Sequence, residues 1–108
     1  MTPERATATV SGVTPIKQLQ QWYLEQCDGD WEHDSGIEIG TLDNPGWQVR
    51  VNVSGTNVEA REFDRVEVER SDADWIQAWV EENTWHAACG PLNLDEALGI
   101  FIAWVGSN

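Results

Sequence analysis

Residues 36–53, GIEIGTLDNPGWQVRVNV, decide the fold, because two alternating runs stand on either side of a turn. Residues 37–40 and residues 47–53 both alternate apolar side chains with polar or small ones. Residues 44–46, NPG, lie between them, where proline fixes φ and glycine is expected to adopt a positive φ. A period of two interrupted by a tight turn predicts a pair of antiparallel strands with one buried face.

Later segments extend this sheet. Residues 58–63 are expected to form a weaker strand or an edge segment, and residues 66–69 alternate valine with glutamate. Residues 74–89 predict a further hairpin, with residues 81–83, EEN, at its tip. The sequence therefore predicts an antiparallel meander of five or six strands.

One helix is predicted before the strands and one after them. Thr14 is a suitable N-cap for the first helix, and Pro15 a suitable first residue, because the missing N–H of proline costs nothing there. Asn93 is expected to cap the last helix, with Glu96 completing a box-like start, and Gly106 is expected to end it. The first helix carries one apolar stripe, formed by Ile16, Leu19, Trp22, Tyr23 and Cys27.

The last helix has a broad apolar face and packs, we expect, on the same side of the sheet as the first. The result is a two-layer α+β domain in which one sheet face is buried under both helices. Residues 1–13 lack an apolar period and are expected to be a disordered tail, so the single domain is predicted to span residues 14–106. The apolar face consists of Leu94, Ala97, Leu98, Phe101, Ile102 and Val105, with Trp104 beside it.

The chain is strongly acidic, with 19 acidic residues against 6 basic ones and a formal net charge of -13. This excess repels phosphate backbones and anionic lipid, so we expect neither nucleic acid nor a membrane surface as a direct partner. A basic protein is the natural complement, because opposite fields accelerate encounter. Acidity can also serve only to keep a protein soluble, and this alternative stays open.

The composition favours a cytoplasmic location. The longest apolar run, residues 100–105, is far too short to cross a membrane, and the N-terminus has no basic region followed by an apolar segment. Two cysteines are present and are expected to be free thiols.

Residues 27–34, CDGDWEHD, concentrate the polar chemistry, and two readings of them are weak. A thiol enzyme needs Cys27 as a thiolate, which the surrounding aspartates and glutamate oppose. A calcium loop of the EF-hand type that starts at Asp28 needs glycine at its sixth position and glutamate at its twelfth. Here glycine stands second and Ile39 twelfth, so this pattern fails.

A zinc site is the main alternative function. Cys27 and His33 lie in this loop, and His86 and Cys89 lie close together near the other end of the chain. Folding could join the two pairs into a Cys₂His₂ site, although the spacing is not that of a standard finger.

The same loop can instead be a binding surface that needs no catalysis and no cofactor. Asp28, Asp30, Glu32 and Asp34 could imitate phosphates in a basic cleft through charge-assisted hydrogen bonds, with Trp31 as an anchor. The structural alternative is that Trp31 is core and that the carboxylates bond loop amides. Both can hold for different residues.

Trp75 and Trp79 mark a second candidate surface. They alternate with Ile76, Ala78 and Val80, so both faces of this strand carry apolar bulk. Either the strand is covered on both faces, or the two tryptophans, with Trp85, form a patch that anchors a partner or pairs two copies of the chain. The oligomeric state stays open.

Several longer motifs occur in a characteristic order. They are QQWYLEQ, CDGDWEH, TLDNPGW, VERSDADWI and GPLNLDEALGIFIAWV, and they extend over residues 16–105. In these motifs the chain resembles the immunity protein 53 family of bacterial polymorphic toxin systems. The resemblance implies a cytoplasmic inhibitor that binds and silences a toxin made by the same cell and encoded nearby. The negative charge suggests a nuclease as one such toxin.

Overall fold

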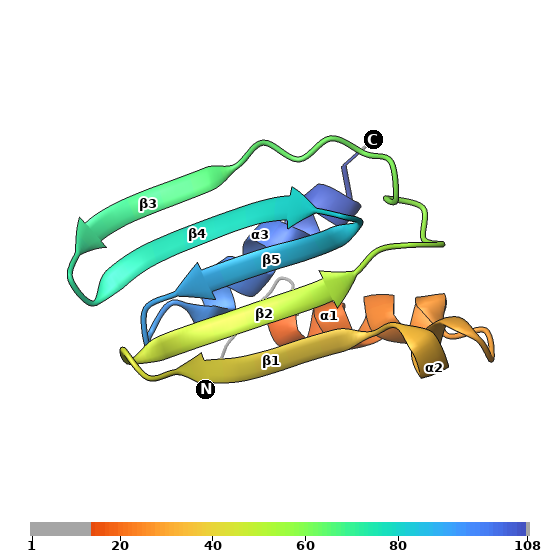
Figure 1. The fold of residues 1–108 in the computed structure, drawn as a ribbon, viewed down its shortest axis with the longest axis horizontal. Helices are drawn as coiled ribbons and strands as arrows, with labels where there is room; N and C mark the ends of the chain where they lie inside the picture. Colours follow the sequence, from red (N-terminus) through yellow and green to blue (C-terminus); the bar gives the residue numbers. More distant parts are fainter. Residues whose placement is uncertain (1–13, 108) are drawn as a thin grey trace, which may run out of the picture.

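The computed structural model describes residues 14–107, so the expected tail at residues 1–13 lies outside the described part. Within these residues, three helices and five strands follow one another (Figure 1). The α+β class and the two terminal helices are therefore confirmed. The elements are α1 (Pro15–Gln26), α2 (Trp31–Asp34), β1 (Ile37–Leu42), β2 (Gly46–Asn52), β3 (Val66–Ser71), β4 (Asp74–Glu81), β5 (Thr84–Cys89) and α3 (Leu94–Val105).

The five strands form one antiparallel sheet in the order β1-β2-β5-β4-β3. Both predicted hairpins are present, but the order is not that of a meander, because β5 inserts between β2 and β4. The chain leaves β2 and runs along the end of the sheet to β3 at the far edge (Figure 1). The inward side chains of β5 are all buried, whereas β3 carries an exposed glutamate row, so the apolar strand is central and the charged one peripheral.

Residues 58–63 form turns and an extended loop instead of the expected strand. Val58 is fully buried, and its carbonyl accepts a hydrogen bond from the Arg61 amide. The Arg61 guanidinium donates to the carbonyls of Trp104 and Ser107 at the end of α3, and the Trp104 indole donates to the Glu62 carbonyl over 2.9 Å. A cation at a helix C-terminus stabilises its free carbonyls, so this segment holds α3 rather than extending the sheet.

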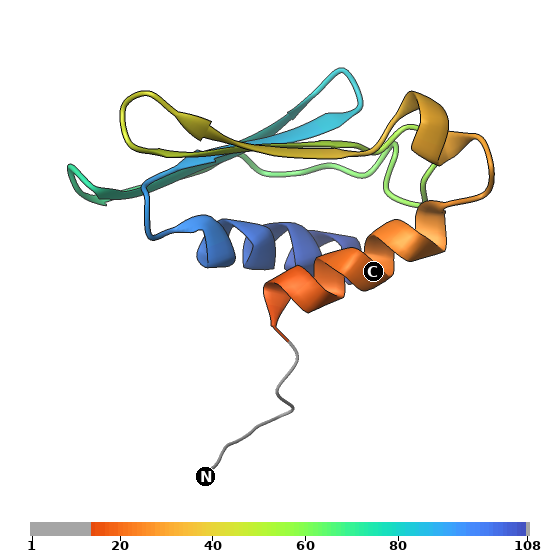
Figure 2. The same ribbon diagram turned by 90° about the horizontal axis from the view of Figure 1, so that it is seen from below.

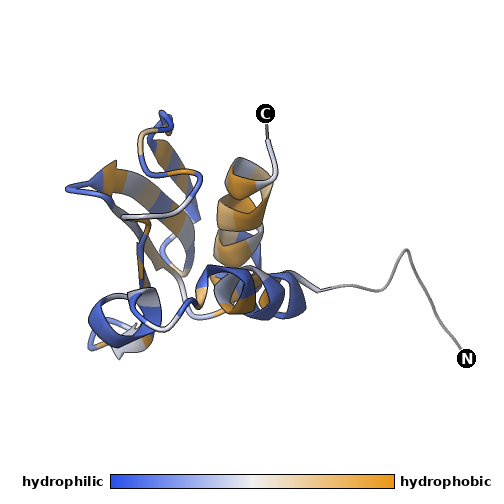
Figure 3. Ribbon diagram, turned by 90° about the vertical axis from the view of Figure 1, so that its right-hand side faces the viewer, coloured by the Kyte–Doolittle hydropathy of each residue, from blue (hydrophilic) through white to orange (hydrophobic). Residues whose placement is uncertain are grey.

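Both α1 and α3 lie on one face of the sheet, as Figure 2 shows. Seen from the end of the sheet, α3 is mostly apolar and lies beside the strands (Figure 3), and its buried residues include Leu98 and Phe101. Phe101 of α3 is central: its ring centroid lies 5.0 Å from that of Trp22 on α1 and 5.1 Å from that of Trp85 on β5. Both pairs are edge-on, the arrangement that aromatic quadrupoles prefer.

The helix α3 buries most of its predicted apolar face, whereas α1 buries only part of its own. On α3, Ala97, Leu98, Phe101 and Trp104 are buried, as expected. On α1 only Leu19 and Trp22 are buried, while Ile16 and Tyr23 are 42% and 38% exposed. The stripe on α1 is therefore narrower than predicted, because this helix touches the rest of the protein mainly through α3.

The two predicted helix starts also differ. The Thr14 side chain accepts a hydrogen bond from the Lys17 amide, which confirms the first cap. Asn93 makes no side-chain cap, so the predicted box at α3 is wrong. Its amide group instead donates to Asp74 over 2.9 Å, and Arg70 bridges Asp74 and Glu96. This polar cluster attaches the start of α3 to β4.

Gly46 is required for a reason other than the one predicted. Its φ is not positive; among the described glycines only Gly29, Gly36 and Gly55 have a positive φ. A Cβ at Gly46 would lie 2.3 Å from the carbonyl oxygen of Cys89 on the paired strand β5. Close approach of two backbones, rather than turn geometry, therefore demands glycine here.

Replacing Phe101 with alanine should remove the contact between the two layers and lower the free energy of unfolding by about 3–5 kcal/mol. Leu92→Ala is the matched control, because this side chain is 94% exposed, and should cost less than about 0.5 kcal/mol. Urea unfolding followed by tryptophan fluorescence measures both. Equal effects of the two changes would show that Phe101 is not central to the core.

Gly46→Ala should cost about 1–3 kcal/mol, because strands β2 and β5 must move apart to admit the methyl group. Gly40→Ala is the control, since a Cβ there meets only the Gln48 side chain, at 3.7 Å, and should change stability by less than about 1 kcal/mol. Equilibrium unfolding of both variants compares them. A Gly46→Ala protein as stable as Gly40→Ala would contradict the close approach.

Candidate functional site

The loop between α1 and β1 is held by two of its own carboxylates. An oxygen of Asp28 accepts the amides of Asp30 and Trp31, at 2.9 and 3.0 Å. The Glu32 carboxylate reaches back and accepts the amides of Asp28 and Gly29, at 2.9 and 2.8 Å. This reciprocal bonding resembles a capping box and fixes the start of the one-turn helix α2. Asp28 and Glu32 therefore bond loop amides, which is the structural alternative given for the loop carboxylates.

These hydrogen bonds stabilise the charged forms of both carboxyls. The Trp31 amide, and then that of Asp30, holds the pKa of Asp28 below its ordinary value of 3.8. The pKa of Glu32 is lowered from 4.5, first by its own backbone amide, with further contributions from those of Asp28 and Gly29. Both carboxylates are thus committed to the loop amides.

Trp31 is a core residue and not an exposed anchor. Only 8% of it is exposed, and its ring lies edge-on to Trp22, with centroids 5.9 Å apart. The Tyr23 ring covers it at 5.8 Å. The structural alternative therefore describes Trp31, because its indole packs against the aromatic residues of α1 and leaves little surface for a partner.

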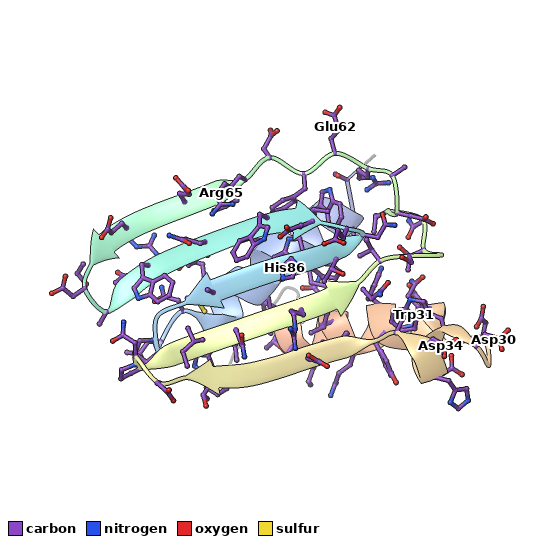
Figure 4. The ribbon with its side chains drawn as sticks, viewed as in Figure 1. Asp30, Trp31, Asp34, Glu62, Arg65 and His86 are labelled. Atoms are coloured by element: carbon purple, nitrogen blue, oxygen red, sulfur yellow. The ribbon has the colours of Figure 1, made fainter. Side chains whose placement is uncertain are left out.

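Asp30 and Asp34 are the remaining carboxylates of the loop, and we call them the acidic corner. Both are exposed, and neither side chain has a hydrogen-bond partner among residues 14–107. They lie at the end of the molecule formed by α2, as Figure 4 shows. The bonds of Asp28 and Glu32 hold the backbone that carries them, so the corner is a preformed acidic surface.

Trp75 and Trp79 lie on the sheet face opposite the helices, and we call this the open face. Both are partly exposed, and no helix or strand within residues 14–107 covers them. The strand β4 is therefore not covered on both faces, and its two tryptophans are partly exposed, which was the second alternative predicted from the sequence. Trp85 is fully buried on the inner face and is not part of the patch.

Trp79 stands at the centre of a row of stacked side chains that crosses the open face. Its ring lies parallel to that of His86 on β5, with centroids 5.1 Å apart and an interplanar angle of 9°. The Arg65 guanidinium lies 5.0 Å from the Trp79 ring centroid on the side of β3. Beyond His86, Arg50 pairs with Glu38 on β1. The row therefore holds these side chains in fixed positions.

The acidic corner and the open face are adjacent. A shallow recess is lined by Asp34 of the corner together with Glu38, Arg50 and Thr84 of the open face. Because Arg50 is also the cross-strand neighbour of His86, the recess connects the corner to the row of stacked side chains. The two surfaces proposed separately from sequence form one continuous surface.

The proposed zinc ligands do not converge, so that alternative is overturned. His86 and Cys89 lie three residues apart on β5 and hence point to opposite faces of the sheet. His86 stacks on Trp79, whereas Cys89 is fully buried and its burial raises the pKa of its thiol. Cys27 bonds the Tyr23 carbonyl at the end of α1, and His33 is exposed on α2. Within residues 14–107 no group of three potential ligands is close enough to hold a metal.

A hollow lies between α1 and α3, on the side away from the open face. It encloses about 750 Å³, and Trp22, Ile102 and Val105 form its apolar floor. Lys17 and Glu25 are its ionisable residues. A lysine and a glutamate on a solvent-exposed groove provide no nucleophile with an adjacent base.

Glu67 was expected from the sequence to be an exposed carboxylate, but Arg65 and His86 were not expected as members of the open face. A charged residue on a strand, whether acidic or basic, predicts only that its side chain faces solvent. The pairing of β3, β4 and β5 is what brings these residues beside Trp79. The alternation with Val66 and Val68 predicts the sheet face on which Arg65 lies, but it cannot predict which residues of other strands lie beside it.

Both capping carboxylates give the fold an acid-sensitive element. Since their folded pKa values are depressed, their stabilising contribution is present above the ordinary values of 3.8 and 4.5 and is lost as pH falls through the folded values. Asp28→Ala should lower the urea midpoint at pH 7 and make the acid-induced loss less steep. Asp30→Ala, which removes no side-chain hydrogen bond within residues 14–107, should do neither. Identical acid profiles for the two variants would contradict the assignment.

No helix in the described part is long and apolar enough to cross a membrane. A comparison with known proteins found no curated protein and no solved structure that matches the chain. The sequence does match the family described as immunity protein 53, over residues 16–106. This span contains α1 from its second residue onward, the loop with its capping carboxylates, all five described strands and α3, so the resemblance in the motifs is confirmed. The chain belongs to the immunity protein 53 family, and its function is immunity.

Proposed function

We propose that this protein confers immunity by binding a cognate toxin in a one-to-one complex and blocking its active site or substrate path. It transforms nothing itself. The toxin is encoded nearby and made by the same cell, and the complex forms in that cell's cytoplasm. The observation that carries this proposal is the acidic corner, two carboxylates free of partners within residues 14–107 on a backbone fixed by two others.

The distribution of charge supports a basic partner. Arg50, Arg65 and Arg70 are each paired with carboxylates of this chain, and Arg61 holds the end of α3. Three of the described cations are thus neutralised locally by carboxylates, whereas Arg61 contacts uncharged carbonyl groups. A formal net charge of -13 then leaves a negative field around the molecule. Such a field speeds association with a positively charged protein and repels nucleic acid.

The preformed backbone of the corner matters for affinity. A flexible acidic loop would lose conformational entropy when it bound, whereas a loop fixed by Asp28 and Glu32 has lost that entropy on folding. Asp30 and Asp34 can then accept charge-assisted hydrogen bonds from arginine or lysine. A toxin that cleaves nucleic acid presents such residues in its substrate cleft, which makes a nuclease the toxin class that this corner fits best.

The open face is the second part of the proposed contact surface. Tryptophan and arginine are the residue types that most often dominate binding energy at protein interfaces, and here they stand together on a rigid sheet. Because this face adjoins the acidic corner, one partner could contact both.

Charge reversal at the corner tests the proposal. The double variant Asp30→Lys, Asp34→Lys should fold normally, slow association with the toxin domain of the neighbouring reading frame by at least about tenfold, and abolish protection of cells that express it. Surface plasmon resonance at two salt concentrations measures the rate, and the difference should shrink at high salt.

The double variant Asp43→Lys, Asp72→Lys is the matched control. It makes the same change in net charge in the two turns at the opposite end of the sheet (Figure 1). It should slow association far less than the corner variant. Equal slowing by both would mean that only the general field matters, and a wild-type protein that bound no neighbouring toxin would refute the function.

A further inference from the structure

Strands β3 and β4 bring carboxylates and tryptophans into register on the open face. Glu67 lies opposite Gln77, and Glu69 lies opposite Trp75. Arg65 immediately precedes β3, and its guanidinium lies beside the Trp79 ring. Each of the two tryptophans therefore has a glutamate of β3 close by.

Around Trp79 these groups form a complete cation-binding arrangement. The Arg65 guanidinium lies 5.0 Å from the centroid of the indole, and its Nε donates to Glu67 over 2.9 Å. The indole face supplies a cation–π attraction and the carboxylate supplies a charge-assisted hydrogen bond. Arg65 thus shows how an arginine is held by an indole and a glutamate together on this surface.

Around Trp75 the same kinds of groups recur, but the chain supplies no arginine to them within the described residues. A recess of about 380 Å³ is lined by Glu67, Glu69, Trp75 and Gln77. The neighbouring cation, Arg70, is bonded to Asp74 and Glu96 and is thereby committed elsewhere. On the β5 side Trp75 meets the backbone of Gly90, whose amide donates to the Trp75 carbonyl over 2.9 Å, so no side chain of that strand stands beside it.

We propose that the recess around Trp75 accepts an arginine side chain of the toxin. This inference rests on the proposed function and names a contact within it. Glu69 accepts the guanidinium, Trp75 stacks on its plane, and the Gln77 amide oxygen accepts a remaining N–H. Arginine fits better than lysine, because its planar, weakly hydrated head can stack and bond at the same time.

The toxin is a better occupant than a second copy of this chain. A copy would bring its own net charge of -13 to the face, and its arginines 50, 61, 65 and 70 are already engaged. Like charges across an interface cost free energy, whereas a basic toxin brings the complementary sign.

The test uses the full-length protein and the toxin domain of the neighbouring reading frame. Glu69→Gln removes the charge but keeps the shape, and should weaken binding by at least about tenfold, since it leaves a guanidinium without its partner. Glu25→Gln is the matched control: this exposed side chain lies on α1, in the layer away from the open face, and its loss of charge should weaken binding by less than about twofold. Equal urea midpoints for the two variants confirm that folding is unchanged.

A double-mutant cycle identifies the arginine. Each surface arginine of the toxin domain is changed to alanine, and its effect on the dissociation constant is measured with wild-type protein and with Glu69→Gln. One arginine should lose its effect in the Glu69→Gln background, which supports the inference.

Three results would overturn the inference. Tight binding that Glu69→Gln leaves unchanged refutes the recess while the proposed function stands. Absence of any complex with wild-type protein refutes both. A dimer of this chain in solution that Glu69→Gln dissociates, seen by light scattering, assigns the recess to a second copy.

Discussion

The packing of Phe101 between Trp22 and Trp85 is the contact on which the rest of the structure depends. It joins α1, α3 and the central strand β5 at one point, with centroid separations of 5.0 and 5.1 Å. Trp31 and Trp104 extend the same cluster to the loop after α1 and to the end of α3. Because a domain of this size has room for one core, the large aromatic side chains gather on one side of the sheet. The opposite face is thereby left to polar groups and to Trp75 and Trp79.

An open sheet face normally consists of mobile, solvated side chains, and here cross-strand pairing makes it ordered. Arg50 pairs with Glu38, Arg65 pairs with Glu67 and also contacts the Trp79 ring, and His86 stacks on the same ring. Each exposed ion pair contributes little to stability by itself. Their effect is on geometry, since they hold side chains in place that would otherwise lose entropy on binding.

The sequence predicts local structure well here and non-local structure poorly. Alternation with period two located all five strands of the described residues, because each strand carries its own burial pattern. The same alternation could not give the strand order, since the pairing of β2 with β5 joins residues more than thirty positions apart. The roles of the loop carboxylates could not be predicted from the sequence for a similar reason. Asp28 and Asp30 have the same side chain, and only the direction of nearby amides makes one a cap and leaves the other exposed.

The two candidate surfaces were separate in the sequence and become one in the fold, and this continuity bears on how the protein acts. Asp34 borders the same recess as Arg50, and Arg50 leads through His86 and Trp79 to the recess around Trp75. A partner that covers this path meets carboxylates at both ends and aromatic rings in the middle. Charges at the rim govern the rate of encounter, whereas packed rings at the centre slow dissociation. Fast capture and slow release are both required of an inhibitor that must silence a toxin before it reaches its substrate.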